Sequence, residues 1–102
     1  MNENSSGRLL EGFDHWSLSV GTTGVQLTAS TALLNYGVRV KAALANTGVI
    51  YVGRSDVTAN SAAATDGFEL NAGEEVFIPT NDASLVYCRA SASSQLVTAL
   101  VV

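Results

Sequence analysis

A series of short apolar segments, separated by turns rich in Gly, Asn and Ser, is the feature that most constrains the fold of this chain. In residues 37–44 apolar side chains take every second position, and that set is Val38, Val40, Ala42 and Leu44. A period of two places one set of side chains in a core and the other in solvent. Related segments occur at residues 15–20, 25–28, 49–53, 68–70, 75–78, 85–90 and 95–102. Short strands with turn residues between them are typical of an all-β fold.

The turn residues predict how these strands follow one another. Asn46 and Gly48 tolerate positive φ, so we expect residues 49–53 to fold back on residues 37–44 as a hairpin. Residues 71–74 contain another Asn and Gly and predict a tight reversal. About eight short strands favour a small antiparallel β-sandwich that is jelly-roll-like, with two packed sheets.

The chain divides into an arm and one domain. Its 102 residues are enough for one hydrophobic core and too few for a second. Residues 1–12 have no strand period and carry Ser, Asn, Gly and charge, which predicts a flexible or extended N-terminal arm. Residues 13–102 form the predicted β-sandwich domain. Residues 54–67 are small and have little to bury, so we expect a long functional or contact loop.

The composition indicates a protein that is covered by a partner. Hydrophobic residues make up 47% of the chain and charged residues 14%, so few charges are available to cover the outside. A small β domain with an apolar surface risks exposed patches and unpaired edge strands, which oligomerisation removes. We therefore expect a homo-oligomer or a module docked on a larger assembly.

The charge pattern and the ends of the chain argue against other partners. The net charge is −4 and the basic residues are scattered, whereas nucleic-acid binding needs a basic patch. No apolar run approaches the ~18 residues of a membrane span. The polar, acidic start is unlike a secretory signal, so we expect synthesis in a cytoplasm.

Few residues have the chemistry of an active site. His15, beside Asp14, is the single candidate base, and neighbours on a strand point to opposite faces, so Asp14 is poorly placed to orient it. No Ser lies in a Gly-x-Ser-x-Gly elbow. Cys88 is the one cysteine, and alternation makes it a buried small apolar residue rather than a nucleophile. We therefore expect no enzyme activity.

Metal and cofactor sites are not expected either. One His cannot supply the several ligands of a cupin metal site. Asp56 and Asp66 do not have the spacing of a calcium loop, and they are interpreted as solvated loop acids. The glutamates at 69, 74 and 75 are interpreted as surface and edge charges rather than a glycosidase pair.

The aromatic residues leave two interpretations open. Aromatic faces stack on sugar rings and Tyr hydroxyls bind their edges, so a glycan platform is one role for these side chains. Packing in the core or at an interface is the other, and it is favoured because the chain has few aromatic residues. The residues concerned are Trp16, Tyr36, Tyr51 and Tyr87.

The sequences of the strands and turns resemble those of small virion proteins of tailed bacteriophages, of the capsid decoration or cement type. The segments that carry the resemblance are VRVKA at residues 38–42, NTGVIYVG at 46–53, SDVT at 55–58, GFEL at 67–70, AGE at 72–74 and VY at 86–87. The resemblance covers about residues 19–102. These motifs are structural turns and strands without a catalytic signature.

The resemblance implies a β-sandwich that decorates the capsid exterior and cements neighbouring capsomers. The implied partners are further copies of the chain, with a trimer favoured over a dimer, and the major capsid protein. Residues 1–12 are then the arm that orders on a capsomer or a neighbouring copy, and residues 54–67 a contact loop. The candidate partner contacts are Arg8, Leu9, Leu10, Trp16, Arg54 and Asp56.

Two other functions stay open at this point. The same fold and the same strand and turn sequences are also compatible with a tail, collar or fibre component that contacts host glycans. A small hydrolase or an enzyme accessory ranks third, and it depends on a role for His15.

Overall fold

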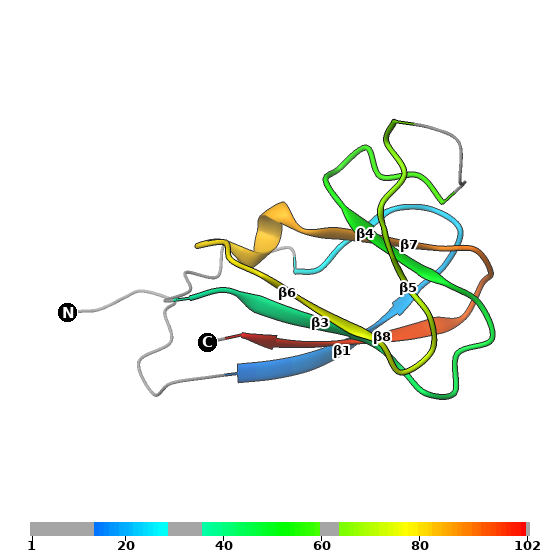
Figure 1. Cartoon of the computed structure of the whole chain (residues 1–102), viewed down its shortest axis with the longest axis horizontal. Coiled ribbons are helices and arrows are strands. Elements are labelled where there is room, and N and C mark those ends of the chain that lie inside the picture. The colour runs from blue at the N-terminus through cyan, green and yellow to red at the C-terminus, as the bar shows by residue number, and fades with distance from the viewer. Residues whose placement is uncertain (1–13, 29–35, 60–63, 102) are drawn as a thin grey trace.

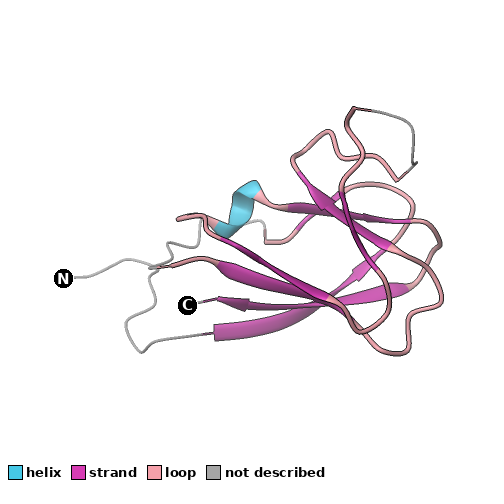
Figure 2. Ribbon diagram, viewed as in Figure 1, coloured by secondary structure: helices cyan, strands magenta, loops and turns pink. Residues whose placement is uncertain are grey.

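The computed structural model describes residues 14–28, 36–59 and 64–101, and its strands form two packed four-stranded antiparallel sheets (Figure 1; Figure 2). The strands are β1 (Asp14–Val20), β2 (Val25–Gln26), β3 (Val38–Ala42), β4 (Ile50–Gly53), β5 (Phe68–Leu70), β6 (Glu75–Ile78), β7 (Tyr87–Ala90) and β8 (Gln95–Val101), and a 3-10 turn, η1 (Ala83–Leu85), precedes β7. The expected all-β sandwich of eight strands is confirmed. The predicted arm, residues 1–12, lies outside the described residues.

The strands pair in a nested order. One sheet has the order β1-β8-β3-β6 and the other β2-β7-β4-β5. Within them β1 pairs with β8, β2 with β7, β3 with β6 and β4 with β5, so the first half of the chain pairs with the second half in reverse. The chain thus forms a long two-stranded ribbon that is rolled up, and its successive pairs alternate between the sheets. The β3–β8 and β4–β7 pairings complete the two sheets.

The core lies between the sheets and follows the predicted alternation. In β3 the side chains of Val38, Val40 and Ala42 are buried, whereas Arg39 and Lys41 are exposed. Cys88 is buried as predicted. The core cluster is completed by residues of both sheets and the turns between them, namely Val20, Leu27, Ile50, Val52, Leu70, Ala83, Val86, Ala90, Val97, Ala99 and Val101.

Some predicted strands are longer than the observed ones. Leu44 was placed on the apolar face, but β3 ends at Ala42 and the Leu44 side chain is 78% exposed. Only Val25–Gln26 of residues 25–28 form a strand. Leu85 belongs to η1, where the Asp82 side chain accepts a hydrogen bond from the Ser84 amide and caps the turn.

The predicted hairpin between residues 37–44 and 49–53 is wrong, because β3 and β4 lie in different sheets. The connection between them is held by side chains near the start of β8. The Gln95 side chain is buried, and its Oε1 accepts hydrogen bonds from the Thr47 and Gly48 amides, each at 2.8 Å. Asn46 donates from Nδ2 to the Leu96 carbonyl at 2.9 Å and accepts from the Leu96 amide at 2.8 Å. The Asn-Thr-Gly segment therefore carries the chain across to the second sheet.

Residues 71–74 form the tight reversal that was predicted, and it too joins the two sheets. The Glu74 amide donates to the Asn71 carbonyl at 2.9 Å, and the Asn71 amide donates to the Glu74 side chain at 2.8 Å. Gly73 has a φ of 85°, which other residues adopt at a cost. The turn connects β5 to β6, which belong to opposite sheets.

Replacement of Gln95 tests the crossing between β3 and β4. We expect Gln95→Leu to lower the free energy of unfolding by roughly 2–4 kcal/mol, because the Thr47 and Gly48 amides lose their acceptor in a largely buried site. The matched control is Ser93→Ala, an exposed change in the same turn, which we expect to stay within about 0.5 kcal/mol of the native chain. Urea unfolding measures both. Equal stability of the two variants would contradict the role given to Gln95.

Candidate functional site

An apolar groove lies along the open side of the sandwich, between β5 and β6. Each is the last strand of its sheet, and within the described part of the chain no further strand pairs with its outer edge. We call this hollow the β5–β6 groove, and its apolar part has a volume of about 430 Å³. Its lining consists of Val52, Gly53, Arg54, Phe68, Val76, Phe77, Ile78, Pro79, Thr80, Leu85 and Val86.

Large apolar side chains are exposed in this groove. Phe68 is 61% exposed and Leu85 60%. Phe77 is 39% exposed, but it alternates with the inward-facing Val76 and Ile78, so its ring lies on the outer face of β6. Phe68 shares a face of β5 with Leu70, which is buried, so the ring points to the interior side of the sheet at its open edge. The Phe77 ring also contacts Arg39, whose guanidinium carbon lies 5.7 Å from the ring centroid. An apolar surface of this kind typically marks a site of contact.

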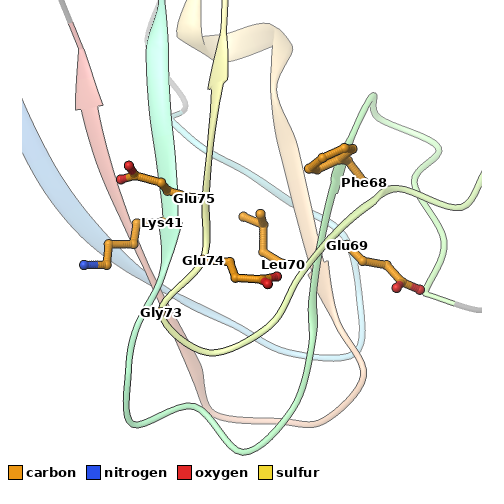
Figure 3. A pocket seen from close by; sticks show the side chains of 7 residues that line it. All are labelled: Lys41, Phe68, Glu69, Leu70, Gly73, Glu74 and Glu75. Carbon is orange, nitrogen blue, oxygen red and sulfur yellow. The ribbon is translucent and has the colours of Figure 1, made fainter.

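One end of the groove, next to its apolar part, is acidic. A hollow of about 480 Å³ is lined there by Lys41, Phe68, Glu69, Leu70, Gly73, Glu74 and Glu75, so its lining has three glutamates and one lysine. Figure 3 shows the Glu74 carboxylate beside Leu70, whereas Glu69 and Glu75 point away to either side. Glu75 forms an ion pair with Arg39, with 3.3 Å between Oε2 and Nη1. The splayed carboxylates do not form the facing pair that glycoside hydrolysis needs.

Arg54 marks the opposite end. It is the one charged residue among those that line the apolar part of the groove. Together with Leu85 it also lines a third hollow, of about 590 Å³, whose other residues are Gln26, Ser55, Ser84 and Tyr87. The three hollows share lining residues and form one continuous surface, with negative charge at one end and Arg54 near the other.

The described parts of the loop that follows β4 are residues 54–59 and 64–67 (Figure 1). The Val57 side chain is only 3% exposed, so the prediction that this loop has little to bury is wrong at that residue. The close approach is made by glycines: a Cβ at Gly67 would lie 2.6 Å from Val57 Cγ2 and 2.8 Å from the Val52 carbonyl oxygen. With Val57 anchored, Arg54 and Asp56 are left exposed on the surface.

Hydrogen bonds close the neck of the same loop. The Thr58 amide donates to the Thr65 carbonyl at 3.0 Å, and the Thr58 hydroxyl donates to Asp66 Oδ1 at 2.6 Å. Asp66 therefore has a structural contact, and Asp56 is exposed. Among the described residues no group of three or more His, Cys, Asp or Glu side chains is arranged to hold a metal ion.

The four aromatic residues considered for a glycan platform have different environments. Tyr51 is 7% exposed; burial raises the pKa of its hydroxyl above the usual value, and the carboxylates of Glu69 and Asp66 raise it further. Trp16 packs against the core, and its Nε1 donates to the Leu27 carbonyl at 2.9 Å. Tyr36 is 75% exposed, and Tyr87 lines the hollow beside Arg54. Two of the four thus contribute to packing.

The predicted contact residues are found in separate places. Arg54 lines the groove and Asp56 lies near it on the loop, so the structure brings these two to the same region. Trp16 lies on β1 in the other sheet from β4, partly buried against the core. Arg8, Leu9 and Leu10 lie outside the described residues. Contact of any of them with a partner stays a prediction.

The surroundings of His15 do not resemble a catalytic dyad. His15 and Asp14 are both exposed, and Asp14 Oδ1 accepts a hydrogen bond at 2.8 Å from the backbone amide of His15. The carboxylate thus contacts the His15 backbone. A triad requires a carboxylate that holds the imidazole.

The groove itself was missed in the sequence. Alternation assigns side chains to faces of a strand, but it does not say which strands are at the edges of the sheets. Phe68 and Leu85 therefore looked like ordinary strand residues. The short length of residues 68–70 and the Pro that follows residues 75–78 are the signals that indicate edge strands.

A comparison with known proteins finds no matching family, no matching curated protein and no matching solved structure. Within the described residues, no helix has the length and apolar character needed to cross a membrane. The functional argument therefore depends on the residues and geometry of this chain.

The buried thiol gives a test of the core. Burial raises the pKa of Cys88 to about 12, so the neutral thiol persists well above neutral pH. Since the thiolate is the reactive form, we expect Cys88 to react with a disulfide reagent at pH 8 only when the domain opens, and to react at once in urea. Absorbance of the released thiolate measures both rates. Fast labelling of the folded protein would contradict this burial.

Proposed function

We propose that this protein is a non-enzymatic decoration protein of a tailed-phage capsid, which binds on the capsid exterior and stabilises the shell by bridging capsomers. The observation that carries the proposal is the β5–β6 groove, where large apolar side chains are exposed on a small domain. Such a surface is typical of a protein that works within an assembly. The strand and turn sequences resemble those of phage decoration proteins, and this resemblance is the reason for proposing a capsid as the assembly.

The nested strand order supports a jelly roll as the architecture. A jelly roll consists of eight strands in two Greek keys, packed as two sheets. A two-stranded ribbon rolled up so that its pairs alternate between two sheets has this form, and the pairs of this chain alternate in that way. The architecture itself is compatible with many functions, so the site carries the functional argument.

Cementing needs surface contacts rather than chemistry. A decoration protein stabilises a shell by burying area across the seams between capsomers, and many symmetric copies multiply the effect of each weak contact. The partners in this proposal are further copies of the chain and the major capsid protein, and no cofactor takes part. Residues 1–12 and the loop of residues 54–67, with its exposed Arg54 and Asp56, are the proposed capsid contacts.

A tail, collar or fibre component that contacts host glycans is the second candidate. The observation in its favour is the hollow beside Arg54, where the Tyr87 ring lies among Gln26, Ser55 and Ser84. Aromatic faces and polar side chains together suit a sugar ring. In this case Tyr87→Ala is expected to abolish binding to cell-surface sugar.

Co-sedimentation with capsids that lack the protein tests the first candidate. We expect saturable binding at a fixed ratio to the capsid protein, together with a higher temperature of capsid rupture, because each copy buries area across a seam. A protein of similar size that does not bind capsids serves as the control for protein trapped non-specifically in the pellet. Absence of binding would place the tail component first and direct the next experiment to glycan arrays.

Removal of residues 1–12 tests the role of the arm. We expect weaker retention on capsids with an unchanged urea midpoint of the isolated domain, because the described residues of the sandwich form a core among themselves. Full-length protein is the control. Unchanged retention after the deletion would contradict the proposal for the arm.

A further inference from the structure

We propose that a second copy of this chain occupies the β5–β6 groove, with the two copies related by a two-fold axis that passes through the apolar part of the groove. This inference deepens the proposed function by naming what covers the groove, and it rests on that function only in treating the groove as a contact surface. Self-association is measured without capsids, so its failure is distinguishable from a failure of capsid binding.

The apolar part of the groove is suited to contact with another copy of itself. Phe68 and Leu85 are exposed by 61% and 60%, and Pro79 is exposed at the end of β6. Within the described part of the chain no further strand pairs with the outer edges of β5 and β6, and natural proteins commonly cover such edges. A two-fold axis through the middle of the apolar part places the apolar stretch of one copy against that of the other, which removes both from water.

The distribution of charge favours a second copy as the occupant. At the acidic end of the groove the Glu74 carboxylate lies beside Leu70, whereas Arg54 is the charged residue of the apolar part. A two-fold axis perpendicular to the groove reverses its direction, so the acidic end of each copy faces Arg54 of the other. The same surface is thus complementary to itself in both apolar and charged character.

The symmetry limits the size of the assembly. A contact of one surface with the same surface is complete when two copies have joined. The inference therefore specifies a dimer, in contrast to the trimer that the resemblance implies. Because the groove is bounded by two short strands, the contact is small, and we expect a dimer that dissociates on dilution.

Sedimentation equilibrium of the whole chain over a range of concentrations tests the apolar contact. We expect a monomer–dimer equilibrium that Phe68→Ser or Leu85→Ser weakens by about tenfold or more, since each change removes apolar contact twice in a symmetric dimer. The matched control is Leu96→Ser, a leucine that is 43% exposed on β8, away from the groove. We expect it to leave the dimer intact. A chain that stays monomeric, a trimeric mass, or equal weakening by Leu96→Ser would overturn the proposal.

Charge reversal tests the two-fold arrangement separately. Arg54→Glu and Glu74→Arg are each expected to weaken the dimer about threefold or more, because each places like charges opposite one another. The double variant has Glu at one end and Arg at the other, so we expect it to restore most of the lost affinity. Thermal unfolding of each variant, done in parallel, shows whether the domain still folds. If the double variant folds and its loss of dimer affinity is the sum of the two single losses, the two-fold arrangement is overturned.

Discussion

The rest of the structure depends on the repeated transfer of the chain between two sheets. Only β4 and β5 follow one another within one sheet, so almost every connection has to leave one layer and enter the other. The backbone amides of such a connection have no strand beside them, and a buried amide without a partner is costly. The Gln95 side chain accepts hydrogen bonds from two of these amides. The Asn46 side chain bonds to both the amide and the carbonyl of Leu96, in the way that the backbone of a neighbouring strand does. Polar side chains at the strand ends thereby make the nested pairing possible.

These side chains also explain which parts of the fold the sequence predicts. Local alternation assigns Val38, Val40 and Ala42 to the core and predicts that Cys88 is buried, and both predictions are confirmed. The partner of a strand is a different question, because it depends on residues far away in the chain. Asn and Gly favour a reversal, but here the Thr47 and Gly48 amides bond to Gln95, far along the chain, and the reversal leads into the other sheet. The predicted hairpin failed for that reason.

The candidate site reflects the same limit. Arg54 was selected from a loop sequence, and it lines the groove. Phe68 and Leu85 were not selected, because an apolar residue in a strand pattern is normally a core residue. Phe68 is exposed because β5 is the last strand of its sheet, and Leu85 is exposed because it lies in η1, at the end of the same groove. Such a position follows from the strand order, which sequence patterns do not supply. Contact residues at the edges of a sandwich are therefore found only when the pairing is known.

The small size of the groove has a consequence for assembly. In the dimer that we propose, we expect a contact between two short edges to bury less area than a permanent interface needs, and therefore to be reversible at the level of one pair. Reversibility is an advantage in a shell with many equivalent positions, because a wrongly placed copy dissociates before neighbours fix it. Once several contacts hold the same copy, the second and later contacts form at a high effective concentration, and the whole becomes stable. A weak apolar groove with opposite charges at its two ends therefore suits an assembly protein, since the charges set the orientation and the apolar surface supplies the affinity.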